Sequence, residues 1–279
     1  MPTTFEYPSV LTIAGFDGSG GAGIQGDMKA ISALGCYATS VLTALPVQNT
    51  CGVRSIFPIP AAAVAEQLAA IFDDVVPHAI KIGMVHTPEL VHTIATALRA
   101  GPAVPVIFDP VMVATSGHRL IEQTTLEALT GQLFPLSELI TPNLDEAAIL
   151  ADMPIPDVTA MHEAGRRIRA RGCRGLLLKG GHLPTPTLVS LYFADDGSVH
   201  EFTTPKLATT NTHGSGCTLS SAIASYRALG YPLLEAVGLG QQYVHEAIRH
   251  GQAVRTGQGN GPLNHFFAPL PLLARELVN

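Results

Sequence analysis

The sequence alternates short apolar runs, each closed by glycine, proline or aspartate, with longer segments of helical periodicity. Runs of strand length occupy residues 10–14, 37–44, 79–82, 104–108, 139–141 and 175–178. Helical patterns occupy residues 27–34, 61–72, 88–99, a segment that begins at Glu146, and residues 158–171, 218–229 and 233–251. Such alternation predicts a mostly parallel sheet covered by helices on both faces, which is an α/β sandwich of three layers.

Residues 188–202 depart from this alternation. Two stretches with the two-residue period of strands flank the turn sequence Asp195-Asp196-Gly197, and this predicts a β-hairpin. No linker, repeat or low-complexity segment interrupts the chain. With 47% hydrophobic and only 14% charged residues, the 279 residues can bury one large core. We therefore predict a single domain over residues 1–279.

Charge and cysteine usage argue against several classes of function. A net charge of −6 without any basic run speaks against a nucleic-acid surface. The four cysteines lie far apart, without the spacing of zinc sites or disulfide frameworks. No apolar run approaches the roughly 20 residues of a membrane span, and the N-terminus lacks signal-peptide features. We therefore expect a cytoplasmic protein with no membrane partner.

One glycine-rich motif leads directly into a predicted helix. Residues 211–218 read Asn-Thr-His-Gly-Ser-Gly-Cys-Thr. A Gly-x-Gly turn before a helix directs free N–H groups and the positive end of the helix dipole at one point, which favours a phosphate. Cys217 lies at the helix start, where the dipole and a nearby lysine would lower the thiol pKa and allow it to act as base or nucleophile. Taken alone, the motif is equally compatible with a tight turn followed by a small buried cysteine.

Polar and glycine-rich segments also lie at the ends of five predicted strands. They are Gly15-Phe16-Asp17-Gly18, Lys81-Ile82-Gly83-Met84, Asp109-Pro110, Thr141-Pro142-Asn143 and Lys179-Gly180-Gly181-His182. In open parallel sheets, ligands bind beyond the carboxyl ends of the strands. We therefore expect these segments to surround one binding site.

Seven motifs, spread in order from residue 11 to about residue 265, are most informative in combination. They are residues 11–25 (LTIAGFDGSGGAGIQ), 47–50 (VQNT), 81–84 (KIGM), 109–112 (DPVM), 141–147 (TPNLDEA), 179–182 (KGGH) and 212–218 (THGSGCT). Together they resemble the ribokinase superfamily, and more narrowly its hydroxymethylpyrimidine/phosphomethylpyrimidine kinase branch. The resemblance implies a ribokinase-like α/β/α sandwich that uses ATP and Mg²⁺ and commonly forms a homodimer.

Four positions depart from the residues usual in that family. Phe16 stands where Ser or Thr is usual, Gly26 replaces Ala, His118 replaces Asp, and Pro46 lies in the loop before Gln48. Phe16 and Pro46 border the expected substrate pocket and leave its fine specificity open.

The resemblance assigns the phosphate chemistry to the glycine-rich motif. Gly214, Ser215, Gly216 and Cys217 would form an anion hole whose N–H groups stabilise developing charge. Cys217 would be the base, where most of the superfamily has Asp; the alternative is an inert buried thiol. Lys179 would contact the nucleotide phosphates, although a lone lysine at a strand end is usually a solvated charge. The residues expected to bind ATP are Lys179, Asn143, Thr212, His213, Gly214 and Gly216.

Glu146 and Asp109 are the candidates for holding the metal. Asn143 and Glu146 match the superfamily's Asn-x-x-Glu motif, which orders Mg²⁺ through water. The same spacing also fits a capping box, in which Asn143 caps the following helix and Glu146 is its third residue. Asp109 could help to hold the cation, or could be a turn residue.

The expected substrate-binding residues are Gln48, Asp17, Gly15, Gly23 and Met84. The amide of Gln48 offers a donor and an acceptor to the ring nitrogen and exocyclic amine of an aminopyrimidine, although a surface-loop role is an alternative. Met84 would pack on the heterocycle or belong to the core. Asp17 and residues 18–23 would form the floor and lid of the pocket, or only a flexible turn. His182 and His213 could suggest a metal site or a catalytic triad, but no carboxylate lies at the required spacing from either. We therefore expect both histidines to donate hydrogen bonds to a phosphate or to a neighbouring loop.

The resemblance therefore implies an ATP-dependent phosphotransferase. Its substrates would be 4-amino-5-hydroxymethyl-2-methylpyrimidine and the monophosphate of that alcohol, in thiamin biosynthesis. A pyridoxal/pyridoxine kinase of vitamin B6 salvage is the alternative, because relatives with the Gly-Ser-Gly-Cys sequence act on vitamin B6. A non-catalytic vitamin- or nucleotide-binding regulator is a third possibility, against which the intact set of catalytic motifs argues.

Overall fold

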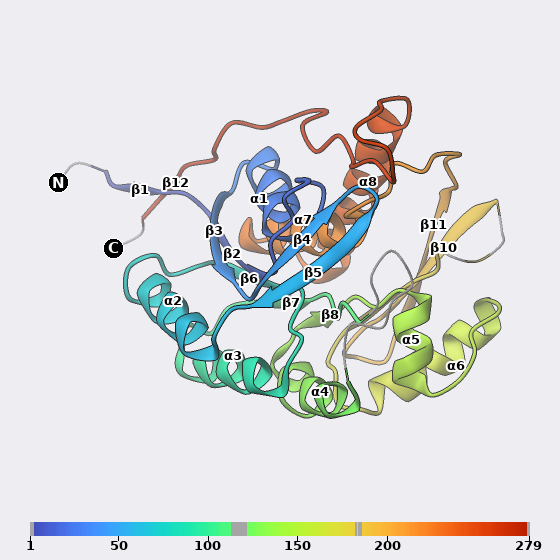
Figure 1. The fold of residues 1–279 in the computed structure, drawn as a ribbon, viewed down its shortest axis with the longest axis horizontal. Coiled ribbons are helices and arrows are strands. Elements are labelled where there is room, and N and C mark those ends of the chain that lie inside the picture. Colours follow the sequence, from blue (N-terminus) through green and yellow to red (C-terminus); the bar gives the residue numbers. More distant parts are fainter. Residues whose placement is uncertain (1–2, 113–121, 182, 184–185, 278–279) are drawn as a thin grey trace.

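An eight-stranded sheet forms the centre of the protein, in a computed structural model that describes residues 3–112, 122–181, 183 and 186–277 (Figure 1). The strand order is β11-β10-β9-β8-β7-β6-β2-β3. Strand β10 runs antiparallel to both of its neighbours, and all other neighbours are parallel. The bounds are β2 Ser9–Ala14, β3 Tyr37–Leu42, β6 Ala79–Ile82, β7 Val106–Phe108, β8 Leu139–Ile140, β9 Leu176–Lys179, β10 Thr187–Phe193 and β11 Val199–Pro205. This confirms the predicted mostly parallel sheet and the hairpin at its edge.

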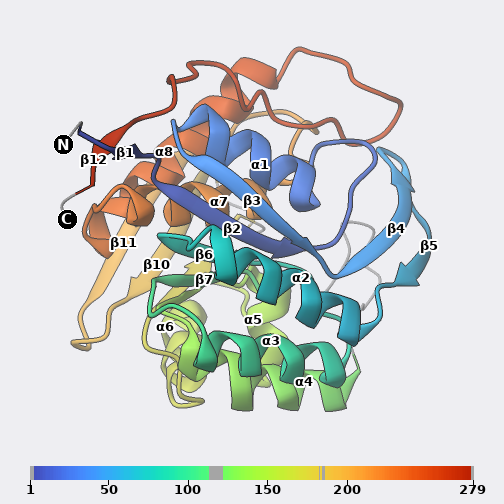
Figure 2. The same cartoon turned by 90° about the vertical axis from the view of Figure 1, so that its left-hand side faces the viewer.

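Helices cover both faces of this sheet (Figures 1 and 2). One face carries α1 Gly23–Ala33, α7 Ser215–Ala228 and α8 Leu233–Gly251. The other carries α2 Ala61–Asp74, α3 Pro88–Ala100, α4 Gln123–Ala128 with the short turns η1 Leu129–Leu133 and η2 Phe134–Leu136, α5 Leu144–Ala151 and α6 Val158–Arg169. The predicted three-layer α/β/α sandwich is therefore confirmed.

The alternation of side chains along the strands gives each face its own core. In β6, Ile80 and Ile82 are buried with α2 and α3, whereas Ala79 is buried with α7 and α8. Lys81 shares the α7 side of the sheet by the same two-residue period and is fully buried. A lysine in this position is exceptional for a core strand, because a buried charge requires a partner.

A second, two-stranded sheet was not predicted. Strands β4 Ala44–Asn49 and β5 Gly52–Pro58 pair antiparallel outside the central sheet, with a register shift between Val47 and Gln48. The predicted β segment 37–44 is thus divided between β3 and β4. Strand β1 Phe5–Glu6 pairs with β12 Arg275–Glu276, so the two ends of the described chain lie side by side (Figure 1).

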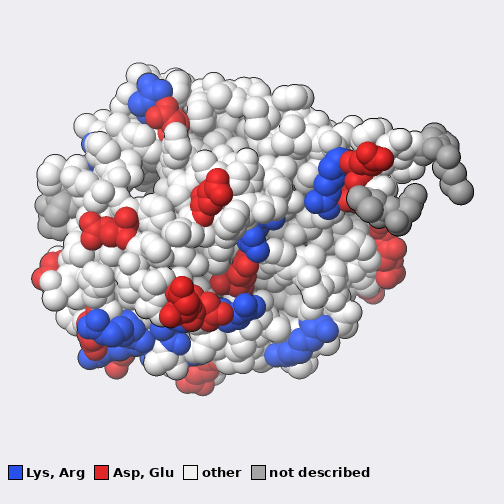
Figure 3. Space-filling view, turned by 180° about the vertical axis from the view of Figure 1, so that it is seen from behind, with Lys and Arg blue, Asp and Glu red and all other residues white. Residues whose placement is uncertain are grey.

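Three helices begin earlier than their periodicity predicts. Helix α1 begins at Gly23 rather than residue 27, α5 at Leu144 rather than Glu146, and α7 at Ser215 rather than Thr218. The first turns of α1 and α7 are rich in glycine and lack an apolar stripe, so hydrophobic periodicity gives no signal there. In the described residues, no helix has the length and apolarity that crossing a membrane requires. Acidic and basic side chains are interspersed on the face shown in Figure 3.

Close packing of α6 on β10 gives a prediction about stability. A Cβ on Gly165 would overlap the ring of Phe193, so Gly165→Ala should lower the free energy of unfolding by about 1–3 kcal/mol. Gly131→Ala is the matched control, because nothing lies within 4 Å of a Cβ there. Denaturant titration of both variants measures the effect. Equal stabilities would mean that the ring of Phe193 moves aside without cost.

Candidate active site

Two adjoining cavities lie beyond the carboxyl ends of the parallel strands, where the sequence predicts a ligand. The first, of about 430 Å³, is lined by residues that follow β2, β6 and β7, by the β4–β5 hairpin and by the start of α7. The second, of about 600 Å³, is lined by residues of β10, β11 and α8, among others. Both cavities are lined by Asn143, Lys179, Thr212, Ser215 and Gly216. The cavities therefore meet at the N-terminus of α7.

This helix N-terminus has no side-chain cap. Gly214 is the N-cap residue with φ +83°, and a Cβ there would overlap the carbonyl oxygen of Gly21. The Ser215 N–H donates to the Thr212 carbonyl at 3.1 Å, so it is already occupied. Gly216 and Cys217 follow in the first turn, where N–H groups have no acceptor within the helix. This geometry suits an anion, with Gly216 and Cys217 as donors.

Cys217 lies between the N-termini of two helices. The backbone N–H of Gly23, the first residue of α1, hydrogen-bonds to the sulfur. Burial nevertheless raises the pKa of the Cys217 thiol to about 11, with Lys81 lowering it and Asp27 and Asp109 raising it. The predicted lowering of this pKa is therefore wrong, because the loss of hydration outweighs the charges and dipoles that favour the thiolate.

Lys179 and Asp109 form an ion pair beside the anion hole. Lys179 Nζ donates to Asp109 Oδ1 at 2.9 Å, and Thr141 Oγ1 donates to the same oxygen at 3.0 Å. A Cβ on Gly216 would lie 3.3 Å from both Asp109 Oδ2 and Lys179 Nζ. Glycine at position 216 therefore leaves the space between the anion hole and the ion pair open.

Asn143 and Glu146 form the capping box considered above. Asn143 Oδ1 accepts from the Glu146 N–H at 2.9 Å, and Glu146 Oε2 accepts from the Asn143 N–H at 2.8 Å. The other oxygen of Glu146 accepts from the Met112 N–H at 3.3 Å. Burial raises the pKa of the Glu146 carboxyl, Lys179 opposes this effect, and Asp109 adds to it. The capping role is confirmed, and it leaves this carboxylate facing the first cavity.

The donor set is compatible with Mg²⁺ bound together with a phosphate. Among the residues that the structure describes, no three or more His, Cys, Asp or Glu side chains are grouped to hold a metal. Mg²⁺ keeps several waters and takes only one or two carboxylates beside substrate phosphates. Asp109 and Glu146 both line the first cavity and offer such oxygens. Their role as metal residues stays a prediction.

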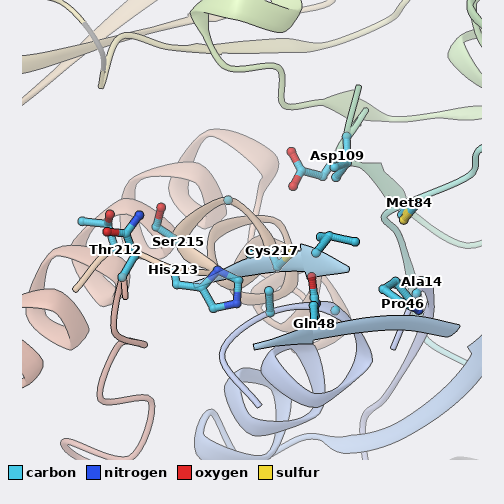
Figure 4. A pocket seen from close by; sticks show the side chains of 18 of the residues that line it. Ala14, Pro46, Gln48, Met84, Asp109, Thr212, His213, Ser215 and Cys217 are labelled. Carbon is cyan, nitrogen blue, oxygen red and sulfur yellow. The ribbon is translucent and has the colours of Figure 1, made fainter. Parts of the chain in front are cut away.

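Apolar side chains lie at one end of the first cavity. Figure 4 shows Met84, Pro46 and Ala14 grouped there and Thr212 at the other end. A Cβ on Gly15 would lie 3.5 Å from the Met84 sulfur and 3.8 Å from Pro46 Cδ. The predicted substrate residues Gly15, Gln48 and Met84, and also Gly23, therefore line one cavity.

The β4–β5 hairpin that carries Gln48 is fastened at its tip. The Asn260 N–H donates to the Thr50 carbonyl at 3.1 Å, and the Gln258 and Gly259 N–H groups donate to Thr50 Oγ1 at 3.3 and 3.2 Å. These bonds tie the hairpin to the segment after α8. They hold the inner face of the hairpin, which includes Pro46 and Gln48, against the cavity.

Asp17 organises the loop between β2 and α1. Its fully buried carboxylate accepts from the N–H groups of Ser19 and Ala22, at 2.9 and 2.8 Å, and lies 2.9 Å from Nε2 of His213. Burial alone would raise the pKa of Asp17, but hydrogen bonds from His213, Ser19 and Ala22 outweigh it and hold the pKa far below its usual range. The carboxylate thus fixes the loop from inside, rather than facing the substrate as predicted. It also gives His213 the acidic partner that sequence spacing could not reveal.

Sequence reasoning missed two parts of the site. The second cavity is lined by side chains that belong to no glycine-rich motif, such as Ser190, Thr204, Gln241 and His245. Lys81 also lines the first cavity. Its motif is identified in the sequence, but no role is predicted there for its side chain. The Lys-Ile-Gly-Met sequence in a buried strand was the available signal for Lys81. His182 and the departure at His118 lie outside the described residues.

Comparison with known proteins identifies the family of this chain. The family described as phosphomethylpyrimidine kinase matches residues 17–264. A thiamine biosynthesis bifunctional protein of Geobacter sulfurreducens is 46% identical over 264 residues, which are 95% of this chain and 53% of that protein. The chain thus spans about half the length of that relative. A hydroxymethylpyrimidine/phosphomethylpyrimidine kinase of Rhizobium meliloti is 44% identical over 257 residues, which are 92% of this chain and 96% of that protein.

A solved structure extends the likeness to a vitamin B6 enzyme. The pyridoxal kinase from Staphylococcus aureus in complex with ADP matches with a TM-score of 0.87 and 29% identity, over 98% of this chain and 100% of that one. Its sequence is more distant than those of the two pyrimidine-related proteins. On the extent of the family match and the identity to its members, the chain belongs to the phosphomethylpyrimidine kinase family.

Proposed function

We propose that the protein is an ATP-dependent kinase of thiamin biosynthesis. It phosphorylates 4-amino-5-hydroxymethyl-2-methylpyrimidine, and then the resulting monophosphate. The observation that carries the proposal is the uncapped N-terminus of α7, with Cys217 in its first turn, at the meeting point of two cavities. One cavity takes the pyrimidine and the other takes the nucleotide, so the reacting groups come together over the anion hole.

The first phosphoryl transfer needs a base, an anion site and charge neutralisation. Cys217 accepts the proton of the attacking hydroxyl. The N–H groups of Gly216 and Cys217 donate to the phosphoryl oxygens as negative charge develops on them. Lys179, paired with Asp109 before the nucleotide binds, turns its ammonium toward the phosphates. Asp109 and Glu146 would hold Mg²⁺, which would supply positive charge to the phosphate oxygens.

The nucleotide occupies the second cavity. Its junction with the first cavity is lined by Asn143, Lys179, Thr212 and Gly216. These residues therefore contact the phosphates of the nucleotide rather than its adenine ring. His213 and Gly214 line only the first cavity. They therefore act on the transferred phosphoryl group and not on the remainder of ATP.

A pyridoxal kinase is the second candidate, because the Staphylococcus aureus enzyme shares the fold over nearly the whole chain. A coupled assay of ADP release separates the candidates. Turnover is expected with the hydroxymethylpyrimidine and its monophosphate, at higher kcat/KM than with pyridoxal. Preference for pyridoxal would establish the vitamin B6 function instead. Absence of turnover with all three would support a non-catalytic binding role.

The outer face of the β4–β5 hairpin supports a homodimer. Leu45, Val47 and Phe57 are 38%, 42% and 57% exposed. Pro46 and Gln48, on alternate positions of β4, line the cavity. A two-stranded sheet is marginally stable alone, and exposed apolar side chains on it favour contact with a second copy. Light scattering should give twice the monomer mass, and Phe57→Lys should shift it to the monomer. A monomeric parent protein would exclude this proposal.

We place the enzyme in the cytoplasm.

Replacing the base should remove turnover and spare binding. Cys217→Ala is expected to lower kcat for the pyrimidine alcohol by about 10²–10⁴, because the backbone donors of the anion hole remain. Nucleotide affinity, measured by calorimetry, should change little. Cys217→Asp should restore part of the rate, since a carboxylate can take the same proton. A Cys217→Ala rate within a few-fold of the parent would exclude this thiol as the base.

Glu146→Gln tests the metal role separately from the capping role. Glutamine keeps the shape of the side chain, and its one oxygen can still accept the N–H of Asn143. Its NH2 group would then face the Met112 N–H, which Glu146 now accepts at 3.3 Å, so a modest loss of thermal stability is expected and the Mg²⁺ titration carries the test. The Mg²⁺ concentration needed for half-maximal rate should rise several-fold, because the negative charge is lost. An unchanged Mg²⁺ titration with a lowered melting temperature would instead leave Glu146 with only a capping role.

Gln48→Leu tests recognition of the ring. Loss of an amide that pairs with the aminopyrimidine leaves polar groups unpaired, which costs roughly 1–3 kcal/mol. The value of kcat/KM for the hydroxymethylpyrimidine should therefore fall by about one to two orders of magnitude. Any activity on pyridoxal should fall less, because that ring has a phenolic oxygen in place of the amine. Equal losses on both substrates would show that Gln48 only supports the hairpin.

A further inference from the structure

A buried ion pair lies beneath the first cavity and has no role in the reaction described above. Lys81 Nζ lies 2.7 Å from Asp27 Oδ2, and both side chains have 0% exposure. Thr12 Oγ1 donates to the same carboxylate oxygen at 2.6 Å, and Ser221 Oγ donates to Oδ1 at 2.8 Å. A buried ion pair seldom stabilises a fold more than apolar side chains of similar size would. Stability alone therefore does not account for the Lys81–Asp27 pair.

The positions of these residues direct the Lys81 ammonium toward Cys217. Lys81 extends from β6 toward α7 and lines the first cavity together with Cys217. Ser221, which binds Asp27, lies one helical turn after Cys217 on α7, and therefore on the same face of that helix. A Cβ on Gly83 would lie 2.8 Å from Lys81 Nζ, so glycine at the strand end leaves room for the ammonium group. Asp27 thus holds Lys81 on one side, and the cavity with Cys217 is on the other.

The charges around the sulfur oppose one another. Lys81 on β6 and the Gly23 N–H on α1 favour the thiolate, whereas Asp27 on α1 and Asp109 after β7 disfavour it. Lys179, at the end of β9, also interacts with Cys217. Burial disfavours the charge of Lys81, but Asp27, Cys217 and Asp109 outweigh it and hold the pKa of the ammonium above its usual value. Lys81 is therefore a permanent cation beside the thiol.

We propose that Lys81 is a positioning residue for phosphoryl transfer: held by Asp27, its ammonium group stabilises the Cys217 thiolate and so sets how much base is available. This deepens, and rests on, the role of Cys217 proposed above. In the step, the substrate O–H bond breaks and its proton goes to the Cys217 sulfur. The oxygen forms a bond to the γ-phosphorus, and ADP leaves with the electron pair of the broken P–O bond. Lys81 keeps its protons throughout.

Two variants with opposite expected effects test the proposal. Asp27→Asn removes the negative charge and should shift the titration of Cys217 to lower pH. The double variant Asp27→Asn, Lys81→Met removes the ion pair without leaving a buried carboxylate unpaired, and should shift it to higher pH by about one unit. The titration is measured as the pH dependence of alkylation by iodoacetamide, with peptide mass mapping to identify modified Cys217. At pH 7.5, the double variant should react about tenfold more slowly than the parent protein.

A second readout links the thiol to the reaction. The rising limb of kcat/KM against pH should move in the same direction and by a similar amount as the alkylation curve. Ser221→Ala is the matched control, because it removes a hydrogen bond to Asp27 without changing a charge. It should lower the melting temperature and leave both pH curves in place. A merely structural role of the ion pair predicts no opposite shifts.

Two outcomes would overturn the proposal. If the double variant alkylates with the pH midpoint of the parent protein, Lys81 does not act on Cys217. If alkylation shifts and the limb of kcat/KM does not, the thiolate does not control the reaction. Alkylation requires neither substrate nor turnover, so it reports on the Lys81–Cys217 interaction even where the proposed function fails. The Cys217→Ala rate then shows separately whether the thiol is the base.

Discussion

The close approach of two backbone segments at Gly21 and Gly214 determines the geometry of the site. Any side chain on Gly214 would overlap the Gly21 carbonyl, and a Cβ on Gly23 would overlap the Gly15 carbonyl. These contacts fold the loop after β2 tightly against the start of α7. As a result, α1 and α7 begin side by side and direct both of their N-termini at Cys217. The Asp17–His213 contact secures the same junction through side chains.

Placing a cysteine at this junction creates an electrostatic conflict. Helix termini and cations favour a thiolate there, while burial favours the neutral thiol and prevails. A buried ion pair, and not only solvent, places charge beneath the site. Lys81 and Asp27 replace apolar side chains on the α7 face of the sheet, where their neighbours Ala79 and Ile31 belong to the core. Strand β6 thus carries a charged side chain on the face that lies beneath the site.

The sequence predicts the scaffold better than the site. Strand β6 and helix α8 were predicted with their observed bounds, because apolar period and glycine or proline boundaries agree there. The first turns of α1 and α7 were missed, since residues that approach a ligand or another backbone cannot also form an apolar stripe. Asp17 and His213 are 196 positions apart, so no motif spacing could join them. The helix dipole at Cys217 can be inferred from the sequence. How far the Cys217 side chain is buried depends on the packing of the β4–β5 hairpin and of the loop between β2 and α1, which the sequence does not show.

The two proposed reactions make different demands on this arrangement. A primary alcohol holds its proton at neutral pH, so the first phosphorylation would need the proposed base, Cys217, and through it the Lys81–Asp27 pair. A phosphate monoester loses its second proton near pH 6, so the attacking oxygen of the second phosphorylation is already ionised and needs no base. What it needs is relief from repulsion between two phosphate groups, and the uncapped N-termini of α1 and α7, with Lys179, supply positive potential where those groups meet. On these proposals, a single anion site beside a half-buried thiol can serve both steps, with the thiol decisive only in the first.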